Sequence, residues 1–328
     1  MIDNALSVTS NVAKLFKHLK ELGRIQQGVL CPPMFHISPT NLCNMNCGHC
    51  CFSNREKSLS IGYDDLCDAL SSIFSISGGC VKAIELTGGG EPTLYEQINR
   101  LIREIKGHND PAIGMNTNAL SVKRVGSGEY GMLDWVRVSL NILSNPRWNE
   151  KFEENVRYLI DHTKKVTACY IVPQKNPSYD GLKRAVEFAN KLNIPTRIAP
   201  DCIQSLDGIK QLIQRIGMTS VGIDNELVFL SDFNVYLEER QNGHCYMHAV
   251  KPFLYTDGWV YACPSSELAV ENDRTMQPEY RVCHMTRIKQ YYSKPLEVRH
   301  HACSYCKYAE QNAIIDLLFA ETENNEFC

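Results

Sequence analysis

Three cysteines, Cys43, Cys47 and Cys50, form a C-x3-C-x2-C motif directly after a short apolar segment of the chain. Their thiolates are soft ligands, and this spacing suits an iron–sulfur cluster or zinc. With only three protein ligands, one metal position stays open to a substrate or cofactor. On spacing alone, zinc with a distant fourth ligand and simple burial of the thiols are the alternatives. The motif therefore predicts a soft-metal site and leaves the metal undecided.

The chain has 15 cysteines in 328 residues, a high and odd number. In a reducing compartment, metal ligation is favoured over disulfide bonds. Outside the cysteine motifs we expect small core or tail residues at Cys31, Cys51, Cys67, Cys80, Cys169, Cys202 and Cys328. Cys51 is the exception worth testing, because its neighbour Cys50 could aim it at the metal.

A glycine-rich segment, Thr87-Gly88-Gly89-Gly90-Glu91-Pro92, follows the second predicted strand. Together with the C-x3-C-x2-C motif after the first strand, it resembles the radical S-adenosylmethionine (SAM) superfamily. The resemblance implies that Cys43, Cys47 and Cys50 hold a [4Fe-4S] cluster whose fourth iron is chelated by SAM. It also implies that Gly88, Gly89, Gly90 and Glu91 surround the SAM amino group. Glycine permits close backbone approach, and the Glu91 carboxylate or a neighbouring carbonyl would accept from the ammonium.

Further contacts to SAM are implied by position in the resemblance and carry no motif of their own. His49 stands where the superfamily usually has an aromatic residue whose backbone reaches the adenine, a mild departure. The strand-end candidates are Asn116, Thr117, Asn118, Ser139, Asn141 and Arg197. For each of them, a polar residue satisfied within the fold is the equal alternative.

A second group of four cysteines lies near the C-terminus: Cys245, Cys263, Cys303 and Cys306. The segment 255–261 between the first two reads as a hairpin with an Asp-Gly turn, and the last two form a C-x2-C pair before a helix. Four thiolates make a closed site that zinc could also fill. The C-x12-G-x4-C arrangement resembles the SPASM extension in its shorter twitch form, which implies one auxiliary [4Fe-4S] cluster. Cys283 lies between the pairs and is a candidate hydrogen-atom donor, a substitute ligand or a buried residue.

Alternating short apolar runs and helical patterns must position these residues. Strands are predicted near 34–38, 81–87, 112–117, 135–140, 166–172 and 196–199, and helices near 63–74, 95–105, 148–162 and 178–192. The segment 126–132 is a weaker helical pattern. Repeated strand and helix indicate a parallel sheet, so the fold class is α/β, a partial (β/α)6 TIM-like barrel. Chemistry in such sheets lies at the carboxyl ends of the strands.

Three regions are predicted along the chain: a leading helix at 1–33, a radical SAM core at 34–220 and a twitch/SPASM-type auxiliary cluster domain at 221–328. In the leading helix, apolar residues recur at helical spacing at Val12, Leu15, Phe16, Leu19 and Leu22. After residue 205 the regular alternation of strands and helices ends. A helix near 209–216, an extended run at 227–237, the cysteine-bearing hairpin and a last helix at 309–319 are predicted there.

Composition narrows the class of protein. Thirty-four basic residues against 37 acidic residues give a net charge of −3, so no global positive field favours DNA, although local patches stay open. The sequence has neither an apolar run of spanning length nor a signal peptide, which predicts a cytoplasmic protein without a membrane partner.

The resemblance implies an enzyme that reductively cleaves SAM to a 5′-deoxyadenosyl radical, which abstracts a hydrogen atom from a substrate C–H bond. The leading expectation is modification of a ribosomally made peptide by epimerisation or crosslinking. The alternatives are dehydrogenation of a sugar-like or aminocyclitol alcohol, rearrangement of a nucleoside or modified DNA base, and a non-catalytic metal-bearing scaffold. Besides the peptide or small-molecule substrate, the implied partner is an electron donor such as flavodoxin or ferredoxin; the implied cofactors are two [4Fe-4S] clusters and SAM.

Overall fold

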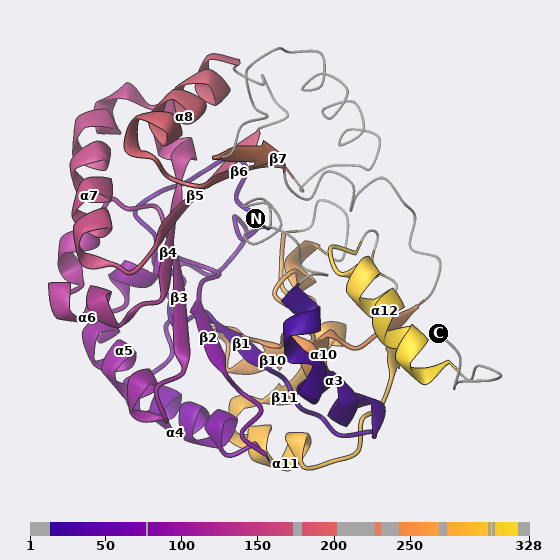
Figure 1. Cartoon of the computed structure of the whole chain (residues 1–328). Coiled ribbons are helices and arrows are strands. Elements are labelled where there is room, and N and C mark those ends of the chain that lie inside the picture. Colours follow the sequence, from indigo (N-terminus) through magenta and orange to yellow (C-terminus); the bar gives the residue numbers. More distant parts are fainter. Residues whose placement is uncertain are drawn as a thin grey trace.

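A curved parallel sheet forms the centre of the structure, with helices along its outer face (Figure 1). This computed structural model describes residues 14–76, 78–172, 179–201, 227–230, 243–268, 274–300, 303 and 306–320. Within these ranges no helix is long and apolar enough to cross a membrane.

Seven strands pair side by side in chain order, and every pairing among them is parallel. They are β1 (Met34–Ile37), β2 (Ala83–Leu86), β3 (Ala112–Thr117), β4 (Trp135–Ser139), β5 (Val166–Val172), β6 (Thr196–Pro200) and β7 (Val228–Leu230). The crossover helices are α4 (Tyr63–Phe74), α5 (Ile98–Gly107), α6 (Ser127–Met132), α7 (Asn149–His162) and α8 (Tyr179–Leu192). The predicted α/β partial barrel is confirmed.

The seventh strand extends the predicted set of six. It is the beginning of the extended run expected at 227–237, of which residues 231–237 lie outside the described residues. The weak helical pattern at 126–132 does form a helix, α6. The helix expected at 209–216 and the boundary near residue 220 also lie outside the described residues.

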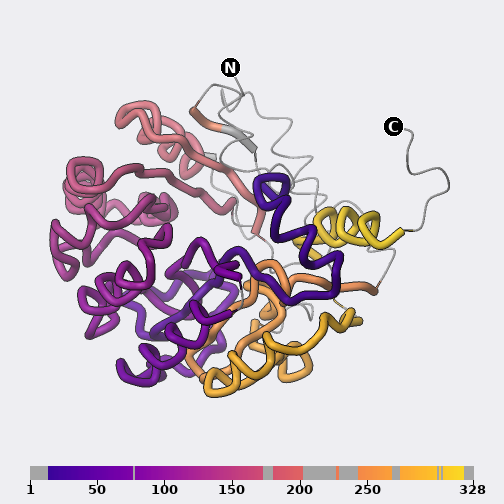
Figure 2. The backbone as a smooth tube through the Cα atoms, turned by 60° about the horizontal axis from the view of Figure 1, so that its bottom comes forward, coloured from indigo at the N-terminus to yellow at the C-terminus, as the bar shows by residue number. Residues whose placement is uncertain are grey.

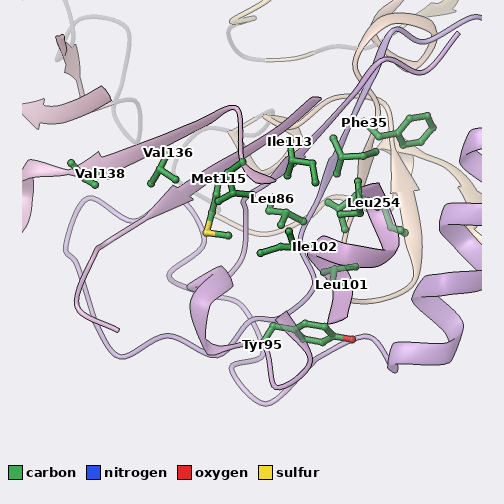
Figure 3. Close-up of a cluster of buried hydrophobic side chains, with 14 of the residues drawn as sticks. Phe35, Leu86, Tyr95, Leu101, Ile102, Ile113, Met115, Val136, Val138 and Leu254 are labelled. Carbon is green, nitrogen blue, oxygen red and sulfur yellow. The ribbon is translucent and has the colours of Figure 1, made fainter. Parts of the chain in front are cut away.

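The main apolar core lies between the sheet and its outer helices. Alternate residues of each strand point there, such as Leu86, Met115 and Val136, and they meet Leu101 and Ile102 of α5 (Figure 3). Burying one such side chain contributes about 1.5–3 kcal/mol relative to leaving it in water. The intervening residues of the same strands therefore point into the barrel, where the polar residues gather.

The leading helix differs from its prediction. Residues Phe16–His18 form a 3₁₀ turn, and α3 (Leu19–Gln26) follows it. Leu15 and Leu22 are buried as expected, but Phe16 and Leu19 are 52% and 64% exposed. A 3₁₀ turn advances about 120° per residue instead of about 100°, so the apolar stripe loses its phase there. Val12 lies outside the described residues.

The C-terminal part adds strands to the same sheet. Strands β9 (Phe253–Leu254), β10 (Trp259–Tyr261) and β11 (Arg281–His284) continue it beyond β1, with β9 parallel to β1 and the other pairings antiparallel. Figure 2 shows this orange segment against the indigo and purple start of the barrel. The predicted hairpin is confirmed, with Gly258 at φ +79° in its turn. The region predicted as an auxiliary domain thus shares the sheet of the barrel.

Five more elements belong to the C-terminal part. Strand β8 (His244–Cys245) pairs with β12 (Arg299–His300) in a separate two-stranded sheet. Helix α11 (Ile288–Tyr292) follows β11, and α12 (Ala309–Phe319) has the bounds expected of the last helix. Helix α10 (Met247–Val250) joins β8 to β9.

Cys31 and Cys80 are core residues as expected, but they form a disulfide bond, contrary to the general expectation of metal ligation over disulfides. Both cysteines are buried, and each stands three residues before its strand. Because Met34 pairs with Ala83 in the register of β1 and β2, the two cysteines are brought opposite each other. The pairing follows from strand register, which cysteine counting does not reveal.

Candidate functional site

The predicted site residues gather at the carboxyl edge of the first three strands. Residues 38–50 follow β1, the glycine segment follows β2, and Asn116, Thr117 and Asn118 end β3. Because these strands are parallel neighbours, their ends meet at one edge.

The glycine segment packs directly against the chain that leads into the cysteine loop. A Cβ on Gly90 would lie 2.3 Å from the Leu42 carbonyl oxygen, and one on Gly88, whose φ is +105°, would lie 2.8 Å from Cβ of Ser38. The Gly89 N–H donates to Ser38 Oγ at 3.0 Å. The glycines therefore permit a close approach between two segments of the chain, which sets the position of the cysteine loop.

Glu91 is buried and its carboxylate is used within the fold. One oxygen accepts from the Thr93 N–H at 3.1 Å, the Thr93 hydroxyl at 2.8 Å and the Thr117 hydroxyl at 2.7 Å. The other accepts from the Asn118 N–H at 2.7 Å. Burial raises the pKa of Glu91, and these hydrogen bonds oppose the rise. Glu91 thus ties the glycine segment to β3, and the carbonyls beside it are the better candidates to accept from an ammonium.

Cys43, Cys47 and Cys50 are partly exposed on one loop. Burial raises the pKa of Cys47 to about 11, and repulsion from Cys50 and Cys43 adds to the rise, which places the three thiols in one electrostatic neighbourhood. The Arg55 guanidinium lies 3.8 Å from Cys50 Sγ. In the part of the chain that is described, no three ligand side chains converge on a single metal ion.

The end of β3 is joined to both neighbouring segments. The Asn118 amide donates to Asn44 Oδ1 in the cysteine loop at 2.7 Å. The Asn116 amide donates to Glu85 Oε1 at 2.7 Å and to Thr87 Oγ1 at 2.9 Å. These side chains therefore hold the loop, the glycine segment and the barrel wall in one arrangement.

Of the other predicted SAM contacts, Ser139 and Asn141 lie at the carboxyl end of β4, whereas Arg197 is the second residue of β6 and stands near its amino end. Asn141 exchanges two hydrogen bonds with the Ile171 backbone, at 2.7 and 2.9 Å, which accounts for its amide within the fold. Ser139 ends β4 and is partly exposed. Arg197 Nε donates to Cys169 Sγ at 3.3 Å, and Arg197 also lines the barrel cavity described below.

His49 is partly buried near the end of β6. Burial lowers its pKa, and the charge of Asp201, the residue after β6, opposes that change. His49 of the cysteine loop therefore lies within electrostatic range of Asp201.

The second cysteine group comes from three separate segments. Cys245 lies on β8, Cys263 follows β10, and Cys303 and Cys306 precede α12. Burial raises the pKa of Cys263 well above its usual value, and the charges of Cys245 and Cys303 raise it further. The Asn312 amide lies 3.9 Å from Cys306 Sγ and its oxygen accepts from the Tyr246 N–H at 2.9 Å. Cys245 and Cys303 thus lie close enough to Cys263 to affect its pKa, and the four-thiolate site stays a prediction.

An aromatic cluster that the sequence reasoning missed lies between the two cysteine groups. It comprises Phe52, Phe253, Tyr255, Tyr261 and Tyr280. Cys50 and Cys51 of the first motif and Cys303 of the second pack against it. The rings of Phe52 and Tyr255 stack at 5.9 Å between centroids. In the sequence these aromatic residues stand close to the cysteine motifs, and this placement could have indicated the cluster.

Cys283 is not brought to the barrel interior. It lies on β11 opposite Val260 and lines a cavity of about 480 Å³ with Trp259, Tyr291 and Lys294. The described residues that line this cavity include none of the predicted SAM or cluster residues. The proposed hydrogen-donor role of Cys283 has no support from this placement, and burial, which raises its pKa to about 12, accounts for the thiol.

A second cavity, the barrel cavity, occupies the inside of the curved sheet and has a volume of about 510 Å³. Its wall includes His36 of β1, Glu85 of β2, Arg137 of β4, Thr167 of β5 and Arg197 of β6. The sequence signal was a polar residue at an alternate position of each buried strand. The sequence alone does not show which face of each strand turns inward, so this cavity was not predicted.

These features define a class of protein: a parallel α/β barrel with a three-cysteine loop and a glycine segment at one edge. The sequence profile of the radical SAM superfamily matches residues 37–215, more than half of the chain, and the chain belongs to this superfamily. It is accordingly an enzyme whose superfamily implies a [4Fe-4S] cluster and SAM. The superfamily and the enzyme class expected from the motifs are confirmed.

Two curated relatives, both probable GTP 3′,8-cyclases, are similar to part of the chain. A probable GTP 3′,8-cyclase of Metallosphaera sedula is 26% identical over 167 residues, 48% of this chain and 52% of the relative. One of Sulfurisphaera tokodaii is 30% identical over 121 residues, 35% and 36% of the two chains. The match thus spans about half the length of the first relative and about a third of the second.

Among solved structures, Streptococcus suis SuiB bound to S-adenosylmethionine has a TM-score of 0.55 at 18% identity, covering 81% of this chain and 69% of that chain. The anSMEcpe structure with bound AdoMet and the Cp18Cys peptide also scores 0.55, at 14% identity, covering 90% and 86%. At these identities the likeness establishes the fold alone.

Proposed function

We propose that the chain binds a [4Fe-4S] cluster and SAM at the carboxyl edge of β1 to β3 and abstracts a hydrogen atom from a substrate in the barrel cavity. The observation that carries this proposal is the close packing of the glycine segment on the chain entering the cysteine loop. When bound, the two cofactors would supply a one-electron cleavage of SAM that yields a 5′-deoxyadenosyl radical.

The residues of the chain have distinct tasks in this proposal. Cys43, Cys47 and Cys50 hold the cluster, and backbone carbonyls of the Gly88–Gly90 segment accept from the SAM ammonium. Glu91 and Asn118 orient both segments through the hydrogen bonds that join them to β3. Asn116, which contacts both the glycine segment and Glu85, links the SAM edge to the cavity wall.

We further propose that Cys245, Cys263, Cys303 and Cys306 hold an auxiliary [4Fe-4S] cluster, as in twitch-type enzymes. A site closed by four thiolates leaves no open metal position, so it would relay an electron and would not ligate the substrate. The aromatic cluster supports this proposal, because it fills the space between the two cysteine groups with apolar side chains that exclude water.

Three substrate classes were open from the sequence: a ribosomal peptide, an aminocyclitol-like alcohol and a nucleoside. SuiB and anSMEcpe were solved with peptides, but the likeness to them extends to the fold only. We favour the nucleoside class, because the two cyclase relatives are named for GTP.

The test measures 5′-deoxyadenosine released from SAM by the anaerobically reconstituted chain with a strong reductant. We expect release by the wild type and none by Cys47→Ala, because removal of one thiolate prevents assembly of the cluster. Cys67→Ala is the matched control, since Cys67 lies on α4 away from both motifs and should leave release unchanged. Release by Cys47→Ala at the wild-type rate would refute the proposal.

Iron content tests the auxiliary cluster separately. Two four-iron clusters give about eight irons per chain. We expect Cys263→Ala to hold about half of that amount while still releasing 5′-deoxyadenosine. Tetrahedral zinc bound to the wild type in place of the second set of irons would show that the auxiliary assignment is wrong.

A further inference from the structure

We propose that the cavity beside Cys283 is the docking site of an acidic one-electron carrier protein. This cavity, the β11 cavity, has a volume of about 480 Å³ and is lined by residues of both β11 and α11. Strand β11 is the last strand at one end of the large sheet, and α11 stands at the lower rim of the molecule (Figure 1). The use of the electrons rests on the function proposed above, whereas binding of the carrier does not.

One helical face forms the outer wall of the β11 cavity. Its residues recur at the i, i+3, i+4 and i+7 spacing of a helix, and all of them line the cavity: Arg287, Gln290, Tyr291 and Lys294. Arg287 directly precedes α11 and Lys294 lies two residues after its end. At 1.5 Å of rise per residue, the two positions are roughly 10 Å apart along the helix axis. Two cations therefore frame the opening of the cavity.

The remaining wall of the β11 cavity is largely apolar. Trp259 and His284 are register partners whose ring centroids are 5.5 Å apart, and Val282 and Cys283 line the cavity with them. Trp259, Val282 and Tyr291 are only partly buried, so part of each side chain is accessible. An apolar centre with a polar rim is typical of protein interfaces, in which Trp, Tyr and Arg carry much of the binding energy.

The two rim cations have no carboxylate partner among the described residues. The described lining of the cavity includes Arg287 and Lys294 but no Asp or Glu, and neither cation forms an ion pair in the described part of the chain. Asp257, two residues before Trp259, is engaged by Arg281 at 3.1 Å. Glu297 is exposed and is not among the described lining residues. Charge complementarity therefore favours an acidic partner at this rim.

A run of side-chain contacts joins the β11 cavity to the two cysteine groups. The Arg281 guanidinium lies 4.9 Å from the ring centroid of Trp259 and 6.0 Å from that of Tyr261. The ring centroids of Tyr261 and Tyr255 are 6.1 Å apart, and Tyr255 stacks on Phe52 at 5.9 Å. The last three residues belong to the aromatic cluster, against which cysteines of both groups pack. Packed side chains thus connect a carrier in the cavity with both groups.

The β11 cavity is also close to the second cysteine group. Trp259 stands four residues before Cys263, and four residues of fully extended chain span at most roughly 14 Å. In the proposed step, one electron leaves the reduced carrier and enters the iron–sulfur site of the chain. The carrier is oxidised and that site is reduced, and no atom passes between the two proteins.

The size of the β11 cavity and its charge fit a transient redox partner better than a nucleic acid. Complexes of electron-transfer proteins lie at the low end of interface size, below about 1,200 Å² in total, and complementary charge speeds their encounter. A nucleic acid is disfavoured, because two cations neutralise only two phosphates and phosphate contacts supply most of its non-specific affinity.

Flavodoxin, an acidic flavin-bearing carrier, is the probe for docking. Calorimetry of oxidised flavodoxin with the full-length chain should show saturable binding that weakens as ionic strength rises. Arg287→Glu and Lys294→Glu should each weaken this binding about fivefold, because each reverses one charge of the rim. Lys151→Glu, at an exposed position of α7, is the matched control and should bind as the wild type does.

Release of 5′-deoxyadenosine separates docking from the reaction. With reduced flavodoxin as the sole reductant, each cavity variant should raise the KM for flavodoxin about fivefold. Dithionite needs no docking site, so it should drive release by both variants at the wild-type rate. If the wild type releases no 5′-deoxyadenosine with dithionite, the proposed function fails, and calorimetry still decides whether the carrier docks.

Several outcomes would overturn the docking site. They include no saturable binding of flavodoxin or of an acidic ferredoxin to the folded wild type, unchanged binding by both cavity variants, and an equal loss of binding by Lys151→Glu. Slower release with dithionite by the cavity variants would show that these residues support the site itself. Self-association of the chain that the same variants abolish, or displacement of flavodoxin by a duplex oligonucleotide, would assign the surface to a different partner.

Discussion

His36 and Glu85 show how single residues acquire their properties from the barrel interior. They are direct partners in the register of β1 and β2, and the nearest ring nitrogen and carboxylate oxygen are 3.3 Å apart. Burial lowers the pKa of His36 to about 4, although Glu85 opposes the change. Burial alone would raise the pKa of Glu85, but the charges of His36, Arg137 and Lys251 lower it to about 2.

The sign of the pH dependence follows from these shifts. In the unfolded chain His36 binds a proton near pH 6.5, while the folded chain resists that proton down to about pH 4. Unfolding therefore takes up a proton in this window, and the free energy of unfolding falls as the pH is lowered from 6.5 to 4. Glu85 extends the loss at lower pH, because its folded pKa lies below its ordinary value.

We expect His36→Gln to reduce this loss of stability between pH 6.5 and 4, because the variant has no imidazole to protonate on unfolding. Urea unfolding at several pH values in this window measures the effect. His284→Gln is the control, since His284 is a partly exposed residue of β11. Parallel pH curves for the wild type and His36→Gln would contradict the assignment.

At the scale of elements, the glycine segment between β2 and α5 is the point where local sequence and long-range packing meet. Its three glycines face the chain between Ser38 and Leu42, and a side chain at any of them would overlap existing atoms. Gly107, at the end of α5, has open space around the position of a Cβ. The two kinds of glycine thus allow a controlled comparison.

We expect Gly90→Ala to destabilise the fold by about 1–3 kcal/mol, the usual cost of overpacking, and to prevent cluster assembly by displacing the cysteine loop. The reason is that the added Cβ would meet three backbone atoms of residues 40–42 within 2.7 Å. Gly107→Ala should leave stability unchanged or raise it by up to about 1 kcal/mol. Chemical unfolding and iron content are the measurements, and normal iron loading of Gly90→Ala would refute the role assigned to the segment.

At the scale of the whole molecule, the Cys31–Cys80 disulfide closes a loop of 49 residues that contains β1, the cysteine loop and α4. Cross-links that close loops reduce the freedom of the unfolded chain, typically stabilising by about 2–4 kcal/mol. The site that this loop carries requires free thiols at Cys43, Cys47 and Cys50. One stretch of the chain therefore needs oxidised cysteines at its two ends and reduced cysteines between them.

We expect a thiol reductant to lower the melting temperature of the wild type and to leave a Cys31→Ala, Cys80→Ala double variant unaffected. Thermal unfolding of the cluster-free chain, with and without the reductant, gives the comparison. The double variant corrects for general effects of the reductant on the other thiols. Equal responses from both proteins would mean that the disulfide does not stabilise the chain in solution.

Much of the barrel follows from sequence pattern alone. β3, β5, α4 and α12 have the predicted bounds because each has a continuous periodic pattern between clear breaks. β9 has only two residues, too few to show any period, so its pairing with β1 was not predictable. The cysteine and glycine motifs are local and are visible in the sequence, whereas the barrel cavity depends on segments that the fold brings together.

The position of β1 has a consequence for synthesis on the ribosome. Its second neighbour, β9, is translated more than two hundred residues after it, so the hydrogen-bonding edge of β1 stays uncovered during most of elongation. At about 5–20 residues per second that interval lasts roughly 10–40 s. An open strand edge of this kind invites pairing with other nascent chains. Production of the intact protein in cells should therefore benefit from slower initiation or from chaperones that shield such edges.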